Sequence, residues 1–288
     1  MNIKLSALAL GITLAYSATA AMAANNATVD LTGNDNTGFV TQINNLETDG
    51  TVRAQGNNNY GAVEQNYNND STAVIDVMFG GSFNSSYTNQ DKTHQTSAEV
   101  NVYGGHGNFN VIDQHTTGQT TAVMRITGHG NENSIDQSNV YASAATINQL
   151  FSNSGDAYIE QRKLGAYNGH NQNATINQSY GQNNVASIVQ EGAYLVATSN
   201  QSGWHNSSDI EQTGLAYTAA GQNSATVNQS GTLNDSYVQQ SGHSLTANVT
   251  QVGFNNYSNV VQAGAGHNAT VNQMGNNNHG VILQVGGW

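Results

Sequence analysis

The strongest constraint on the fold of this 288-residue chain is a glutamine that recurs every eleven residues near the C-terminal end. Six glutamines follow one another at this spacing, namely Gln229, Gln240, Gln251, Gln262, Gln273 and Gln284. A short, nearly fixed period is typical of architectures in which each unit contacts only its neighbours. We therefore expect a stack of small units rather than one globular core.

The repeated unit is a set of spaced positions: Gly, Asn three residues later, and then a small residue, Val or Ile, and Gln at steps of two. Alternate residues of an extended strand point to one face, so Asn, the small residue, Val/Ile and Gln share one face of a β-strand. Four units match at every position, namely Gly181-Asn184-Ala186-Ile188-Gln190, Gly203-Asn206-Ser208-Ile210-Gln212, Gly231-Asn234-Ser236-Val238-Gln240 and Gly253-Asn256-Ser258-Val260-Gln262.

Weaker copies extend the repeat toward the N-terminus, beginning with Gly33-Asn36-Gly38-Val40-Gln42. Some copies replace the glutamine, and Ile126 occupies the Gln position in one of them. Arg53 falls where Val or Ile is expected, which indicates either an irregular coil or a displaced register. Two longer steps of 17 residues, which begin at Gln161 and at Gln212, are most simply insertions in turns.

One strand of this kind cannot bury its inner face alone, whereas two facing strands form a coil of about 22–24 residues that can stack on further coils. Gly and the Asn/Gly-rich stretches between the strands favour turns with positive φ. The absence of Pro agrees with a chain that is nearly all strand, because Pro cannot donate to a strand ladder. We predict an all-β fold, a β-solenoid of stacked strand-turn-strand coils that becomes cross-β amyloid on polymerisation.

Side-chain amides make up about a quarter of the chain, with 43 Asn and 24 Gln. Coils stacked about 4.7–4.8 Å apart allow Asn to bond to Asn and Gln to Gln along the axis, which satisfies buried amides except at the two ends. An uncapped end is then a template for another chain. The candidate self-assembly residues are Asn36, Gln42, Asn184, Gln190, Asn206, Gln212, Asn234, Gln240, Asn256, Gln262, Asn278 and Gln284.

The first 23 residues have the pattern of a secretory signal peptide. Lys4 precedes an apolar run from Leu5 to Tyr16, and Ala21-Met22-Ala23 places small residues where a signal peptidase reads them. The run is too short to cross a bilayer, which needs about 20 residues, and no later segment approaches that length. The predicted organisation is a signal peptide at 1–23, a short segment at 24–32 and a repeat region at 33–288, degenerate to about 100 and regular from about 181.

Composition and spacing also argue against several functions. A formal net charge of −12, with six Lys+Arg, disfavours nucleic acid, because phosphate binding needs a basic surface. The nine His are irregularly spaced and there is no Cys, so we expect no metal site and no cofactor. The carboxylates do not cluster as they would in a polysaccharide hydrolase, and Asp is too sparse for the calcium-binding nonapeptide solenoid. We expect neither catalysis nor insertion into a membrane.

In these features the chain resembles the curlin family, the secreted bacterial proteins that assemble into curli amyloid fibres. The resemblance covers nearly all of residues 33–284 and rests on units such as Gly181 to Gln190. It implies a β-solenoid subunit that leaves the cell through an outer-membrane pore with accessory chaperones and is nucleated at the cell surface by another curlin subunit. It also implies polymerisation into an extracellular biofilm matrix that mediates adhesion and aggregation. Familiar curlins have fewer repeats and carry a secretion-targeting segment, for which the stretch 24–32 is short.

Two alternatives stay open beside the main fibre subunit. The last repeat is well formed and uncharged, which favours the main subunit over the minor, nucleating curlin, where a basic or membrane-anchoring last repeat is expected. A monomeric β-solenoid adhesin that binds a surface ligand along its side is the alternative of a different class. Growth from seeds separates a fibre subunit from such an adhesin.

Overall fold

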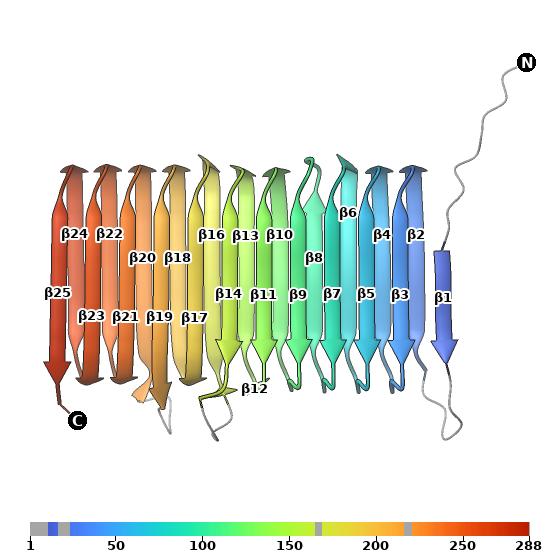
Figure 1. The fold of residues 1–288 in the computed structure, drawn as a ribbon, viewed down its shortest axis with the longest axis horizontal. Helices are drawn as coiled ribbons and strands as arrows, with labels where there is room; N and C mark the ends of the chain where they lie inside the picture. The colour runs from blue at the N-terminus through green and yellow to red at the C-terminus, as the bar shows by residue number, and fades with distance from the viewer. Residues whose placement is uncertain (1–10, 17–23, 165–168, 216–220, 288) are drawn as a thin grey trace, which may run out of the picture.

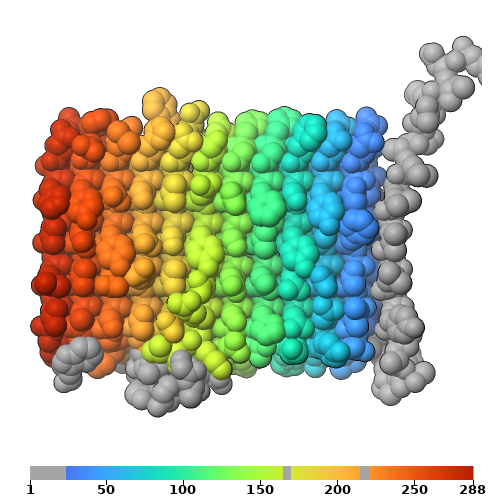
Figure 2. Space-filling view, viewed as in Figure 1, coloured from blue at the N-terminus to red at the C-terminus, as the bar shows by residue number. Residues whose placement is uncertain are grey.

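The computed structural model describes residues 11–16, 24–164, 169–215 and 221–287, and these residues form a β-solenoid (Figure 1). Every regular element in them is a β-strand, which confirms the all-β prediction. The chain alternates between two long parallel sheets, so that two consecutive strands make one coil (Figure 1). The first and last coils lie at opposite ends of the stack, and rows of side chains run along it from coil to coil (Figure 2).

Two sheets contain almost all of the strands. Sheet A has twelve strands, which pair in the order β1 (Gly11–Tyr16), β3 (Thr37–Ile43), β5 (Tyr60–Asn66), β7 (Ser85–Asp91), β9 (Phe109–His115), β11 (Glu132–Ser138), β14 (Asp156–Arg162), β17 (Val185–Ala193), β19 (Ser207–Leu215), β21 (Asp235–His243), β23 (Tyr257–Ala265) and β25 (His279–Gly286). Sheet B has eleven, in the order β2 (Asn26–Asn34), β4 (Asp49–Asn57), β6 (Thr72–Ser82), β8 (Ser97–Tyr103), β10 (Thr121–His129), β13 (Ala144–Asn153), β16 (Gln172–Gln182), β18 (Leu195–Trp204), β20 (Asn223–Thr232), β22 (Thr246–Phe254) and β24 (Asn268–Asn276). The short strands β12 (Val140–Tyr141) and β15 (Gly169–His170) pair beside them.

Strand pairing places each repeat directly on the equivalent repeat of the next coil. Ile135 in β11 pairs with Ile112 in β9 on one side and with Ile159 in β14 on the other. All three side chains are fully buried, and burial alternates along each of these strands as the repeat spacing predicts. The Val/Ile rows of the two sheets therefore form a continuous apolar centre along the solenoid.

Tight corners between the strands depend on residues that tolerate positive φ. Asn183 and Asn255 have φ of 53° and 55° at equivalent corners. At Gly203 the φ is 101°, and an added Cβ would lie 2.1 Å from the carbonyl oxygen of Gly231 in the next coil. Glycine is required there because the backbones of adjacent coils approach too closely for a side chain.

The N-terminal coils are more regular than the sequence suggested. Val52 occupies the buried Val/Ile position of β4, whereas Arg53 faces outward and its Nη1 lies 3.2 Å from a carboxylate oxygen of Asp76. The sequence alignment placed this unit one residue out of register, because it took Gln55 as the residue of the glutamine row. In the structure Gln55 faces outward, and Ala54 occupies that row.

The repeat also starts before Gly33. Strand β2 begins at Asn26 and pairs with β4 along its whole length, so residues 26–32 belong to the first coil of sheet B. Of the predicted signal peptide, only β1 lies in the described residues, and it pairs in parallel with β3 at the N-terminal edge of sheet A.

Candidate functional site

The buried glutamines of sheet A form one hydrogen-bonded ladder along the solenoid. In every step Nε2 donates to Oε1 of the glutamine in the next coil, at 2.7–2.9 Å. The second N–H donates across the coil, as from Gln190 to the carbonyl oxygen of Asn173 at 3.0 Å. The ladder consists of Gln42, Gln65, Gln90, Gln114, Gln137, Gln161, Gln190, Gln212, Gln240, Gln262 and Gln284.

The ladder crosses both of the predicted turn insertions. Gln161 and Gln190 are bonded although 29 residues separate them, and Gln212 and Gln240 are bonded across 28 residues. Steps without an insertion span 22–25 residues. The extra residues therefore leave the inner register unchanged.

An asparagine ladder runs beside it, at the start of the same strands. Asn206 accepts at Oδ1 from Nδ2 of Asn234 at 3.0 Å, and Asn234 accepts in the same way from Asn256 at 2.9 Å. The ladder has two runs, Asn36, Asn59, Asn84, Asn108 and Asn131 in the first and Asn184, Asn206, Asn234, Asn256 and Asn278 in the second. All twelve residues selected from the sequence lie in these two ladders.

The two ladders run in opposite directions, which makes the ends of the solenoid different. Each glutamine donates toward the C-terminal end, whereas each asparagine donates toward the N-terminal end. At the C-terminal end, Gln284 carries the donor that no further coil receives, and Asn278 carries the acceptor. At the N-terminal end of the ladders, Gln42 carries the acceptor and Asn36 the donor, and Nδ2 of Asn36 also donates to the carbonyl oxygens of Thr32 and Gly56, as Nδ2 of Asn234 does to those of Ser230 and Gly253. The ends are complementary to each other.

Continuity of the asparagine ladder is broken at one coil. Gly155 takes the asparagine position, and its backbone N–H donates to Oδ1 of Asn131 at 2.9 Å. Three residues earlier, Ser152 takes the place of the repeat glycine. A Cβ on Gly155 would lie 2.5 Å from Oγ of Ser152 and 2.7 Å from Oε1 of Gln178, so these two side chains leave no room for another there.

The glutamine row of sheet B covers only the C-terminal part of the solenoid. It consists of Gln149, Gln178, Gln201, Gln229, Gln251 and Gln273, each donating to the next at 2.8–3.0 Å. The first five strands carry Leu31, Ala54, Val77, Val102 and Ile126 in the same row. At the boundary Oε1 of Gln149 is buried without a partner, so the expectation that only the end amides lack partners was wrong.

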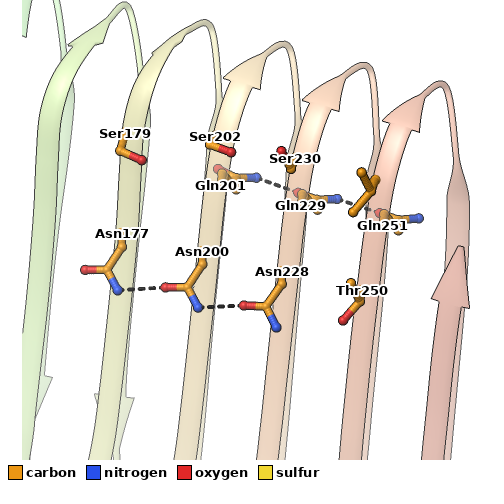
Figure 3. Close-up of a pocket in the computed structure, with 11 residues that line it drawn as sticks. Asn177, Ser179, Asn200, Gln201, Ser202, Asn228, Gln229, Ser230, Thr250 and Gln251 are labelled. Carbon is orange, nitrogen blue, oxygen red and sulfur yellow. Dashed lines mark hydrogen bonds between the residues drawn. The ribbon is translucent and has the colours of Figure 1, made fainter. Parts of the chain in front are cut away.

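A further ladder, made of asparagines, lies on the outer face of sheet B and was not predicted. Asn148, Asn177, Asn200 and Asn228 are half-buried and are joined by Nδ2-to-Oδ1 bonds of 2.8 Å. Figure 3 shows the last three of them with the two bonds that join them. Each of these asparagines directly precedes a glutamine of the inner row. The recurring Asn-Gln pair is the signal that would have revealed it, because adjacent residues of a strand point to opposite faces.

Carboxylates stack on the outer face of sheet A. Asp136 pairs with Asp113 on one side and with Glu160 on the other. Partial burial raises the pKa of Asp136, and repulsion from Asp113 and Glu160 raises it further against the opposing effect of His115 and Arg162. Burial raises the pKa of Asp113 in the same way. Sequence spacing alone did not show that these carboxylates meet.

Within the described parts of the chain, no group of three or more His, Asp or Glu residues is placed to hold a metal ion. The same residues include no helix with the length and hydropathy needed to cross a membrane. The prominent constellation in the described residues is therefore the set of amide ladders with their two open ends.

These features define the class of the protein, a β-solenoid of short repeats stabilised by buried amide ladders. The sequence matches the family described as the Curlin associated repeat over residues 222–253 and 242–275, which lie in β20 to β24. Over these residues the chain carries the curlin repeat, which together with the β-solenoid fold supports a curli-like structural protein. No curated protein matches the chain.

Proposed function

We propose that this chain is a secreted subunit that polymerises into extracellular curli-like amyloid fibres of the biofilm matrix and serves there in adhesion and aggregation. The observation that carries the proposal is the glutamine ladder of sheet A, which continues from Gln42 to Gln284 with the same bond in every step. A structure that repeats without change from coil to coil can continue from one chain into the next. The curlin repeat supports the same function, because the family forms extracellular fibres.

The geometry of the ends supports head-to-tail addition. When β25 of one copy meets β3 of the next, Gln284 donates to Gln42, and Asn278 accepts from Asn36. The side-chain ladders of sheet A and its backbone pairing then continue at the joint as they do inside the chain. Contact between two C-terminal ends would instead place donor against donor at the glutamine positions. A joint of this kind requires that β1, which pairs with β3, is removed with the leader.

Within this function we propose the role of main fibre subunit. The last repeat keeps Asn278, Ile282 and Gln284, and its strand β25 carries no Lys or Arg, so it can receive another copy of the same chain. The proposed partners are other copies of the chain, a second curlin subunit as nucleator, and an outer-membrane pore with accessory chaperones. The latter partners follow from the family resemblance.

The test is seeded polymerisation of the chain that starts at Ala24. We expect a lag in thioflavin T fluorescence that preformed fragments abolish, and a meridional reflection at about 4.7–4.8 Å in fibre diffraction. A soluble monomer with β circular dichroism that ignores seeds would contradict the proposal and would favour a monomeric adhesin.

End variants then test the ladders themselves. The double variant Asn278→Ala, Gln284→Ala removes both ladder side chains of the C-terminal end and should slow elongation from seeds. The matched control is Asn272→Ala, which removes an exposed amide from the outer face of the adjacent strand β24. Equal elongation rates for the double variant and the control would show that the terminal ladders do not direct growth.

A further inference from the structure

The inner rows of sheet B meet imperfectly when two copies join head to tail. This inference rests on the proposed function, in which β24 of one copy lies on β2 of the next. By the register of the repeat, Ala269 then meets Ala27 and Val271 meets Val29, so two inner rows continue with identical residues. In the third row Gln273 meets Leu31, an amide against an aliphatic side chain.

The side chain of Gln273 is placed to donate a hydrogen bond to the next coil, and Leu31 has no acceptor for it. This glutamine side chain is 6% exposed, Oε1 accepts from Gln251 at 2.8 Å, and Nε2 donates to the carbonyl oxygen of Tyr257 at 2.8 Å. In every earlier step of this row, the glutamine also donates from Nε2 to the glutamine of the next coil. At the joint Leu31 offers no acceptor, so this N–H is buried without a bond.

A boundary of the same kind already exists inside the chain. Ile126 precedes Gln149 in this row, and there Oε1 of Gln149 has no hydrogen-bond partner. The covalent chain holds that boundary together, because neighbouring coils inside a copy are joined by turns. No covalent connection holds the joint between two copies.

We propose that the contact of Leu31 with Gln273 makes the joint between consecutive copies the weakest plane of the fibre. Leu31 thereby determines how firmly a second copy is held, although it belongs to neither ladder of sheet A. The surface involved is the inner row of the end strands β2 and β24, and the partner is a second copy of this chain. A partner with glutamine at the position of Leu31 would be held more firmly than the chain holds itself.

The test exploits the fact that the mismatch can be repaired from either side. Leu31→Gln supplies an acceptor for Gln273, and Gln273→Leu supplies an aliphatic partner for Leu31. Each single variant moves the boundary into the chain, where turns hold the coils together. The double variant restores a mismatch at the joint, with a glutamine acceptor facing a leucine.

Fibres of each variant are sonicated under fixed conditions, and their mean length is followed by electron microscopy. We expect each single variant to fragment about tenfold more slowly than the wild type, because a buried unsatisfied N–H no longer weakens the joint. The double variant should fragment at nearly the wild-type rate. Val77→Gln, which places a glutamine at an aliphatic position, and Gln201→Leu are matched controls in the same row away from the joint and should leave fragmentation unchanged.

The outcomes separate this inference from the function on which it rests. If the wild-type chain forms no fibres, the proposed function fails and the joint fails with it. If fibres form but both single variants fragment at the wild-type rate, or the double variant is slower still, only the role of Leu31 is overturned. Circular dichroism of each variant checks its fold. If one single variant does not fold, the other still tests the contact of Leu31 with Gln273.

Discussion

Gly181 and Asn184 fit each other within a single repeat: a Cβ on Gly181 would lie 2.4 Å from Nδ2 of Asn184. The asparagine can reach its ladder only because the residue three positions earlier has no side chain. The carbonyl oxygen of Gly203 would also lie 1.9 Å from such a Cβ, so the glycine serves both its own coil and the next. The Gly and Asn positions of the repeat are therefore one structural unit.

This relationship predicts a coupled pair at Ser152 and Gly155, where the glycine and the asparagine are both replaced. Gly155→Asn alone should destabilise the chain, because the new side chain meets Oγ of Ser152 and displaces Oε1 of Gln178. The double variant Ser152→Gly, Gly155→Asn removes the serine contact and should join the two runs of the asparagine ladder, so it should be more stable than Gly155→Asn by about 1 kcal/mol. Urea unfolding of the dilute, unassembled chain measures both. Additive effects of the two substitutions would contradict the coupling.

The position of a glutamine in the ladder should set the effect of removing it. Gln137 accepts from Gln114 at 2.8 Å and donates to Gln161 at 2.7 Å, and all three are buried. Gln137→Leu leaves one donor and one acceptor unpaired, and we expect a loss of about 2–5 kcal/mol in the free energy of unfolding. Gln284→Leu at the solvated end should lose less than about 1 kcal/mol. Similar unfolding midpoints for the two variants would show that the ladder bonds contribute little.

The carboxylate column on sheet A predicts greater stability in mild acid. The folded state raises the pKa of Asp136, so it binds more protons than the unfolded state between the unfolded value of about 3.9 and the folded pKa. This contribution to stability is fully present below the unfolded pKa and is lost as the pH rises through the folded pKa.

Asp136→Asn should therefore stabilise the chain at neutral pH by roughly 0.5 kcal/mol, a like-charge effect that added salt weakens. Urea unfolding from pH 7 to pH 4 should show the difference between variant and wild type shrinking as the pH falls. Asp30→Asn, on the exposed outer face of β2, is the control. A constant difference across this range would contradict the assignment to Asp136.

Strand β1, which lies in the predicted signal peptide, should limit growth at one end. Strand β1 pairs with Gly38 to Ile43 of β3, which is the edge that receives another copy in the proposed joint. The chain that retains its leader should thus elongate more slowly from seeds than the chain that starts at Ala24. Thr13→Pro in the leader-bearing chain should restore part of the rate, because proline cannot donate to a strand ladder. Equal rates with and without the leader would show that β1 does not cover this edge.

The strand repeat was accessible from sequence because glutamine spacing and strand alternation are both local. Gln240, Gln262 and Gln284 indicate the ladder of sheet A through a step of two repeats, and no tertiary information is needed. The aliphatic part of the row in sheet B was less accessible, because Ala54 and Val77 do not resemble glutamine and only pairing across coils shows that they share its position.

Other features depend on geometry that spacing does not contain. Gln55 is spaced like a ladder residue but faces outward, because the strand is offset by one residue from the alignment on glutamine. The replacement of the repeat glycine by Ser152 and of the repeat asparagine by Gly155 is coupled, because side chains at these two positions would touch. The stack of Asp113, Asp136 and Glu160 follows from in-register pairing of strands that lie 23 or 24 residues apart.

The opposed directions of the two ladders in sheet A also affect the electrostatics of a long fibre. Each side-chain amide has a dipole, and a column of amides that all point one way accumulates potential at its tips. Here the Gln dipoles point toward the C-terminal end and the Asn dipoles toward the N-terminal end. The two columns of sheet A oppose each other in every coil from Gln42 to Gln284 except that of Gly155, so their combined field at the growing tip changes little as the fibre lengthens.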